Sequence, residues 1–285
     1  QGAIGYDTLE RRCFMKQIIL MNSCLAVLFI FSHAFTAIVM ADDAAARQIM
    51  QQVEDRDDGD HMTSDLLMVL VDKNGSKRKK WFQTFSKDFG MDEKRIMFIK
   101  DPPDIRNTGF LTHDYDDPHR DDDQWLFLPA LGKTKRIASQ DKSSSFMGSD
   151  LNYSDMTQRN TEDYDYKLLK ETTINTHKVW LIESVPKTRD IEDENGYKKS
   201  VLAVRQDNFV VIKAKMWTSD GKYIKYRSVK NLEQIDDIWV VLESHIVKKQ
   251  GKRVVHQTFM KQSQVRFNQG LSDRLFTIRR LEKGL

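Results

Sequence analysis

Pairs of turn-forming residues recur along this chain between short runs of β-branched, aromatic and aliphatic residues. Asn74-Gly75, Asp220-Gly221 and Gln250-Gly251 each separate two such runs, and Asn195-Gly196 and Asp236-Asp237 mark further turns. Residues of these types allow the tight connections of β-hairpins. No Gly/Ser-rich linker divides the 285 residues. The spacing therefore predicts one large antiparallel sheet, strongly curved or rolled into a barrel, rather than separate domains.

The runs between the turns predict about eleven strands. They cover residues 62–71, 77–85, 95–99, 164–171, 177–185, 200–205, 209–217, 223–229, 239–247, 253–261 and 264–268. A further hairpin is expected over residues 125–137, where apolar residues occupy both faces of the first strand before Pro129. Such a strand either separates a packed side of the sheet from a covered cavity, or lies buried in the core.

Two segments depart from the strand pattern. Apolar residues at helical spacing predict a helix over residues 42–54, with Asp42 and Asp43 at the positive end of its dipole. Residues 141–160 are apolar yet irregular and interrupt the sheet. We interpret this second segment either as a cover folded across a barrel mouth or as an ordinary packed loop.

The strongly apolar run of the chain lies near its N-terminus, over residues 18–40, behind Lys16. It ends in Val39-Met40-Ala41 before two acids, which is typical of a signal-peptide cleavage site. We therefore predict a signal peptide over residues 1–41 and an exported domain over residues 42–285. The run is also long enough for a permanent anchor, but the polar residues that interrupt it favour cleavage.

Two export routes remain open, and both lead to the periplasm. Met15-Lys16-Gln17 is a compact start for an ordinary secretory signal, which we favour slightly and which leaves an upstream extension before Met15. Arg11-Arg12 in front of Phe14 and Lys16 resembles a twin-arginine signal. Cys13 and Cys24 both precede the cleavage site, so the processed protein is expected to contain no thiol.

Several classes of function find little support in the residues. The formal net charge of +3 is too small to indicate a nucleic-acid partner. The chain contains no phosphate-binding or dinucleotide fingerprint and no Gly-x-Ser-x-Gly nucleophile elbow. His177, His245 and His256 fall within predicted strands, where a hydrogen-bonded histidine is more common than a catalytic base. We expect a protein that is not an enzyme and that needs no cofactor.

Two charged clusters each allow a functional and a plain interpretation. Residues 113–123 are dense in His and Asp, but a local run of charge usually points its groups apart into water, so we predict a solvated loop without a metal. The basic residues 77–80 precede Trp81. They fit either contact with anionic headgroups or, as we favour, a solvated hairpin tip that protects a strand edge.

The block from Asp122 to Met156 carries a family resemblance. Trp-Leu-Phe-Leu-Pro-Ala-Leu at 125–131, the basic strand at 133–137, Phe-Met-Gly-Ser-Asp at 146–150 and Tyr-Ser-Asp at 153–155 together resemble the outer-membrane lipoprotein-sorting (LolA-like) family. Residues 220–222, 238–240, 265–268 and 271–280 agree with it less specifically. The resemblance extends from Asp55 to the end of the chain.

The resemblance implies an incomplete β-barrel with a few short helices as a lid, holding lipid in the periplasm. The expected function is a non-enzymatic carrier or acceptor of lipoproteins or lipids; the alternative is a lipid-sensing or exporter-accessory module without net cargo transfer. Expected partners are acyl chains, an inner-membrane exporter or sorting machinery, and a membrane surface in transient contact. The candidate lipid-cavity residues are Trp125, Phe127, Phe146, Met147, Leu151, Trp180, Trp217 and Trp239.

Overall fold

The computed structural model describes residues 42–285, and the predicted signal segment with its two cysteines and cleavage site lies outside these residues. The described part begins with helix α2 (Ala44–Glu54). The Asp43 side chain caps this helix by accepting hydrogen bonds from the backbone N–H groups of Ala45 and Ala46. Ala46 and Met50 are its buried residues, so the predicted amphipathic helix is confirmed. Among the described helices, none combines the length and apolar character that a membrane span requires.

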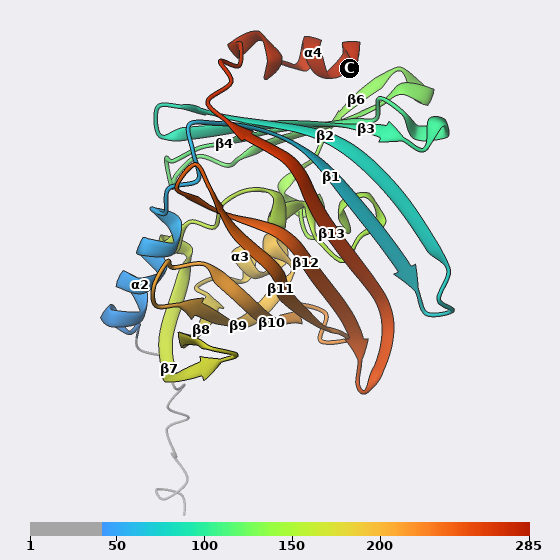
Figure 1. Cartoon of the computed structure of the whole chain (residues 1–285). Helices are drawn as coiled ribbons and strands as arrows, with labels where there is room; N and C mark the ends of the chain where they lie inside the picture. The colour runs from blue at the N-terminus through green and yellow to red at the C-terminus, as the bar shows by residue number, and fades with distance from the viewer. Residues whose placement is uncertain (1–41) are drawn as a thin grey trace, which may run out of the picture. The chain divides into compact units, whose positions relative to one another are not determined.

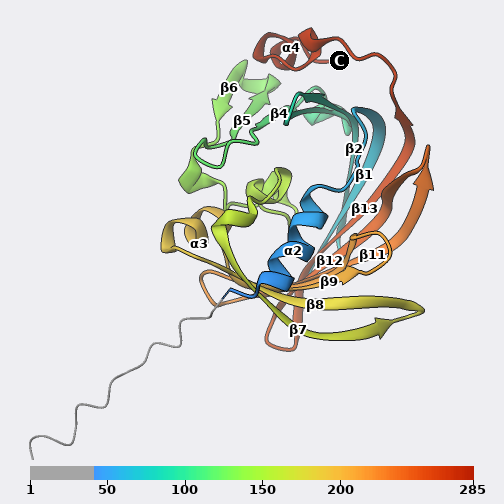
Figure 2. The ribbon, with the colours of Figure 1, turned by 90° about the vertical axis from the view of Figure 1, so that its left-hand side faces the viewer.

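Thirteen strands form one antiparallel sheet in the order β6-β5-β4-β3-β2-β1-β13-β12-β11-β10-β9-β8-β7. The strands are β1 (His61–Asp72), β2 (Lys77–Phe89), β3 (Asp92–Asp101), β4 (Gly109–Asp114), β5 (Asp123–Leu128), β6 (Lys133–Arg136), β7 (Tyr164–Ile174), β8 (His177–Pro186), β9 (Tyr197–Arg205), β10 (Val211–Thr218), β11 (Ile224–Ile235), β12 (Ile238–Gln250) and β13 (Arg253–Phe267). Pairing of β1 with β13 joins a first meander, β1–β6, to a second, β7–β13. Strands β6 and β7 form the two edges, and Figures 1 and 2 show the sheet curved into an open barrel. The predicted mainly β, incomplete barrel is confirmed.

Most of the predicted turns are confirmed. Asn74-Gly75 lies between β1 and β2, and Asp236-Asp237, both with positive φ, connect β11 to β12. Asn195-Gly196 lies in the connection between β8 and β9, as predicted, and this connection also contains a helix that was not predicted. Asn195 ends helix α3 (Arg189–Asn195), and Gly196 is its left-handed C-cap with φ 79°. The dipeptide suits a helix end as well as a hairpin, because both need a residue with positive φ.

Two strand predictions are also corrected. Strand β4 was not predicted, because Gly109–Asp114 is buried on both faces and shows no alternation. It places His113 and Asp114 in the sheet rather than in the predicted solvated loop. The two strands predicted over 253–268 are a single strand, β13. Gln264 has a positive φ of 53°, and the β1–β13 register shifts between Thr63 and Asp65.

The first meander is covered on both faces. Met97 and Phe110 pack on its concave face with Phe146 of the chain that links β6 to β7. Phe98 packs on its convex face with Leu281 of helix α4 (Ile278–Lys283) near the C-terminus. Figure 1 shows α4 outside the curved sheet. The two-faced apolar strands predicted from the sequence therefore need two covers, one on each side.

The connecting segment, residues 137–163, links the two edges of the sheet and lies with α2 on the concave side (Figure 2). It is built from short turns rather than regular helices: η3 (Ser139–Asp141), η4 (Phe146–Gly148), η5 (Tyr153–Met156) and η6 (Thr161–Asp163). Lys80 Nζ donates to the Met147 carbonyl at 2.6 Å, and Gln124 Nε2 donates to the Tyr153 carbonyl at 2.9 Å. These buried and half-buried contacts fix the segment to the first meander.

Candidate functional site

An apolar cavity of about 300 Å³ lies on the concave face, between α2, the connecting segment and the second meander. Its volume is at the lower end of the usual range for ligand pockets. Its apolar lining comes from Met50, Val53, Leu151, Leu202, Val211, Ala214, Met216 and Ile246. The cavity is therefore large enough for a small apolar ligand or a single acyl chain.

A small residue, Ala214, lies in the sheet wall of the cavity. Ala214 of β10 lies opposite Leu202 of β9 on one side and opposite Arg227 of β11 on the other. Residues in such register share one face of the sheet. Leu202, Ala214 and Arg227 all line the cavity, and Met50 and Val53 of α2 line it as well.

A hydrogen-bonded polar cluster adjoins the apolar lining. The Asp155 carboxylate accepts hydrogen bonds from the Asn152 backbone N–H at 2.8 Å, from the Tyr197 hydroxyl at 2.7 Å and from Arg159 at 3.2 Å. Lys225 Nζ donates to the Tyr197 oxygen at 3.0 Å and to Asn152 Oδ1 at 2.8 Å. Burial lowers the pKa of Lys225 to about 8, although nearby Asp155 acts in the opposite direction.

Arg227 is the member of this cluster that lacks such partners. Its side chain lines the cavity, and its Nε has no hydrogen-bond partner within residues 42–285. Burial lowers the pKa of Arg227; the charge of Asp155 raises it, and the charge of Arg159 lowers it further. The cavity thus combines an apolar wall with an unpaired cation.

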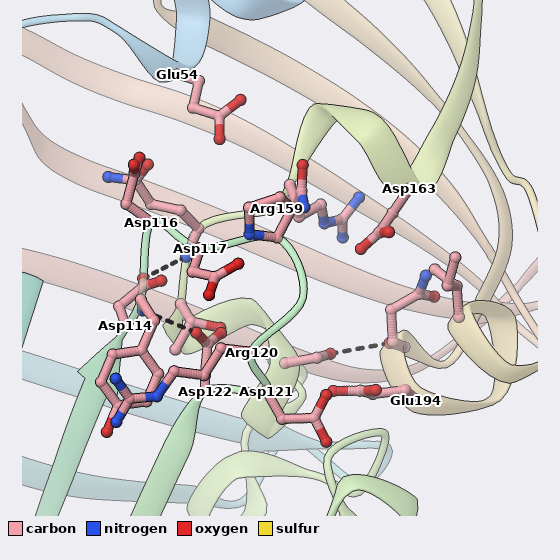
Figure 3. A pocket seen from close by; sticks show the side chains of 18 of the residues that line it. Glu54, Asp114, Asp116, Asp117, Arg120, Asp121, Asp122, Arg159, Asp163 and Glu194 are labelled. Carbon is pink, nitrogen blue, oxygen red and sulfur yellow. Dashed lines mark hydrogen bonds between the residues drawn. The ribbon is translucent and has the colours of Figure 1, made fainter. Parts of the chain in front are cut away.

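A second pocket of about 170 Å³ lies beside the cavity and shares Glu54, Gln158 and Arg159 with it. Figure 3 shows its acidic lining, which comes from the loop after β4, from α2, from η6 and from α3. The labelled acids are Glu54, Asp114, Asp116, Asp117, Asp121, Asp122, Asp163 and Glu194. Burial and the neighbouring Asp122 raise the pKa of Asp114 to about 8. Within residues 42–285, no group of three or more His, Cys, Asp or Glu side chains could hold a metal ion.

The polar run at residues 113–123 is divided between the two faces of the sheet. Asp114 accepts a hydrogen bond from the Gln158 backbone N–H at 2.6 Å and lines the acidic pocket. His113 faces the other way, where its Nε2 lies 3.1 Å from the Phe276 carbonyl oxygen and its ring packs against Trp125 at 4.9 Å. Sequence neighbours in a strand point to opposite faces, so His113 points away from the acidic pocket that Asp114 and most of the following residues of the run line.

Comparisons with known proteins agree with this architecture. No curated protein matches the chain. A family model described as an uncharacterized protein family matches residues 91–283. Among solved structures, a DUF1329 family protein from Desulfovibrio piger is 27% identical with a TM-score of 0.76, covering 83% of this chain and 98% of that one. A putative outer membrane lipoprotein-sorting protein domain from Vibrio parahaemolyticus is 26% identical with a TM-score of 0.75, covering 84% and 98%.

A LolA superfamily protein from Nitrosomonas europaea, 20% identical over 82% of this chain and 98% of that one, shares the fold with a TM-score of 0.63. The chain belongs to a LolA-like family. The resemblance found in residues 122–156 is thereby confirmed. In this LolA-like chain the resembling block supplies both strand β5 and the connecting segment.

The structure brings only some of the predicted lipid-cavity residues of this LolA-like protein together. Leu151 lines the cavity. Phe146 and Met147 belong to the adjoining core under the first meander. Trp180 lies on the concave side of β8, where it stacks on Phe209 with ring centroids 5.9 Å apart.

The other four predicted residues lie on the convex side. Trp125 and Phe127 pack with Leu281 and other residues of the C-terminal segment. The ammonium groups of Lys199 and Lys215 lie 4.9 and 4.3 Å from the centre of the Trp217 ring. Trp239 packs with Val179 and Ala203 in a separate cluster. The reason is the period of the strand: Leu126 and Met216 occupy the concave positions next to Trp125 and Trp217.

Sequence reasoning missed the polar members of the site. Lys225 and Arg227 are two residues apart in a strand, a spacing that puts both side chains on one face of the sheet. Charged residues at alternate positions of a strand normally indicate the solvent-exposed face of a sheet. The sequence therefore gave no indication that this face is the inner one. Tyr197 and Arg159 come from distant elements and gave no local signal.

Proposed function

We propose that this LolA-like protein is a periplasmic, non-enzymatic carrier or acceptor of lipids or lipid-modified proteins. Its cavity would shelter an acyl chain from water. The observation that carries the proposal is the apolar cavity bordered by α2, the connecting segment and the sheet. The Vibrio parahaemolyticus protein described as a lipoprotein-sorting domain, 26% identical over most of both chains, supports it.

The physical gain of such a site is the removal of methylene groups from water. Each buried methylene contributes about 0.8 kcal/mol. At about 300 Å³ the cavity suits one chain, and a cargo with several chains would need α2 or the connecting segment to move away. We infer that the cavity accepts one chain without such a movement.

The limited volume also favours a second candidate function. A module that binds a single lipid and reports it to a protein partner, as a lipid sensor or an exporter accessory, needs no more space than this cavity offers. A carrier differs from such a module in moving lipid between two membranes. Net transfer therefore separates the two candidates.

Filling the cavity tests the proposal. Ala214→Phe puts a ring into the open space, whereas Lys213→Phe adds the same ring to an exposed position of the same strand. We expect the full-length protein to bind a fluorescent acyl probe, A214F to lose most of that binding, and K213F to keep it. Unchanged binding by a folded A214F protein would contradict the cavity as the acyl site.

Transfer is measured with donor vesicles of phosphatidylethanolamine and phosphatidylglycerol that carry a fluorescent lipid, and with unlabelled acceptor vesicles. A carrier accelerates the appearance of fluorescence in the acceptors, and A214F slows this transfer. Probe binding without accelerated transfer would leave the sensor or accessory function as the better account.

A further inference from the structure

Three cations and two carboxylates meet where the second meander contacts the connecting segment. Lys225 and Arg227 come from β11 and Arg159 from the connecting segment, opposite Asp150 and Asp155. Asp155 is engaged by three donors, as described above. Asp150 Oδ2 accepts a hydrogen bond from the Thr258 hydroxyl at 2.8 Å and lies 2.8 Å from His256 Nδ1. Both carboxylates are therefore occupied by groups other than Arg227.

The remaining acids of the cavity, Glu54 and Asp58, are not among the charged groups that act on Arg227. Asp58 interacts electrostatically with Arg56 and Arg95, and Glu54 with Asp55 and Asp116, whereas the charged residues that act on Arg227 are Asp155 and Arg159. Arg227 thus keeps an excess positive charge against an apolar wall. Its side chain lines the cavity, and its Nε is fully covered.

An unpaired buried cation is unfavourable, and a bound anion would remove the penalty. A guanidinium holds a carboxylate or a phosphate through two parallel hydrogen bonds. The sheet residues beside Arg227 that line the cavity, Ala214, Met216 and Ile246, are uncharged. The carboxylate that acts on Arg227 is Asp155, which is already engaged by three donors. The same cavity therefore suits a molecule with an anionic group at one end and an apolar chain behind it.

We propose that the cavity binds an anionic single-chain amphiphile whose oxyanion group lies on Arg227 and whose chain extends toward Met50 and Val53 of α2. This inference rests on the proposed function, because it assigns the head group of the lipid that the cavity shelters. Carboxylate and phosphate share the recognition chemistry, and the experiment distinguishes them.

The test compares three ligands of equal chain length in displacing a fluorescent acyl probe from the full-length protein. Dodecanoate and dodecyl phosphate carry an anionic group, and dodecanol does not. We expect the preferred anionic ligand to bind about tenfold or more tightly than dodecanol, the scale of a charge-assisted hydrogen bond. Tighter binding of dodecanoate would identify the anionic group as a carboxylate, and tighter binding of dodecyl phosphate would identify it as a phosphate.

Arg227→Met should abolish that preference and leave dodecanol affinity within about twofold, since the methionine keeps an apolar wall without the donor. Arg266→Met, at an exposed position of β13, should leave all three affinities unchanged. Thermal unfolding without ligand checks the fold of both variants. R227M should be at least as stable as the parent protein, because an uncompensated buried charge is removed.

Equal affinity of dodecanol and both anions for the parent protein, or an anionic preference that persists in a folded R227M protein, would overturn the role of Arg227. Acyl binding would then still stand. Failure of all three ligands and of the probe to bind would overturn the proposed function together with the inference.

Discussion

The position of Asp114 in the fold strongly raises the pKa of its side chain. It ends strand β4, is only 9% exposed, and faces the acidic pocket together with Asp122. Its pKa of about 8 lies above the value of about 3.9 expected in the unfolded chain. At pH values between these two pKa values, the folded state therefore binds more protons than the unfolded state. This contribution to stability is complete below pH 4 and is lost as the pH rises through 8.

Asp114→Asn should weaken this pH dependence, because the amide stays neutral. We expect the variant to exceed the parent protein in unfolding free energy at pH 8.5 by about 1.4 kcal/mol or more, the equivalent of one pKa unit. The gain should shrink toward pH 5. Urea unfolding at both values measures it, with Asp121→Asn, at an exposed position of the same pocket, as the control. Parallel pH profiles for D114N and the parent would refute the assignment.

Phe146 is a core residue rather than a mobile lid residue. It is fully buried, and its ring lies 5.0 Å from that of Phe110 and 5.5 Å from that of Tyr153. Phe146→Asp should lower the unfolding free energy by about 4 kcal/mol or more, because it buries an unpaired charge. Met147→Asp is the matched control, since Met147 is half-buried and has a left-handed backbone that Asp tolerates well. Equal losses in urea unfolding would contradict this difference.

At the scale of elements, two irregular segments decide how the first meander is covered. The connecting segment packs on its concave face, and the C-terminal segment with α4 packs on its convex face. Both segments consist largely of short turns and irregular chain, with α4 as their one α-helix. Their contribution comes from a few apolar side chains placed against the sheet.

Helix α4 should therefore stabilise the whole sheet through one anchor. Leu281 is fully buried, and its side chain leaves no space for a Cβ at Gly109, which would lie 2.6 Å from Leu281 Cδ1. Leu281→Ala should lower the unfolding free energy by about 2–5 kcal/mol. Ile278→Ala, in the same short helix but 40% exposed, should change it little. A thermal shift of equal size in both variants would argue against the anchor.

At the scale of the whole molecule, residues 42–285 are the part that follows the predicted cleavage site. We propose that export removes residues 1–41, so that α2 becomes the N-terminal helix. The intact mass of protein recovered from the periplasm should correspond to residues 42–285. A product that keeps the apolar segment and sediments with membranes would contradict cleavage. Replacing Arg11 and Arg12 by lysine should leave export intact if the ordinary secretory route operates.

Local sequence signals determined the sheet, its turns and the first helix. Paired Gly, Asn and Asp residues give tight turns through dihedral angles that few other residues adopt, and a period of two or 3.6 residues reports a strand or a helix without knowledge of the partner. These signals missed helix α3, which Gly196 caps with the same conformation that a tight turn uses, and strand β4, where burial on both faces removes the period.

The tertiary structure alone decided which face of each strand is the inner one. Trp125 and Trp217 are as apolar as the residues that line the cavity, yet they lie on the convex side, while the charged Arg227 faces the cavity. Alternation along a strand places neighbouring side chains on opposite faces of the sheet. It does not determine which of the two faces becomes the inner one. That choice depends on where α2, the connecting segment and the C-terminal segment pack, and these contacts join residues more than a hundred positions apart.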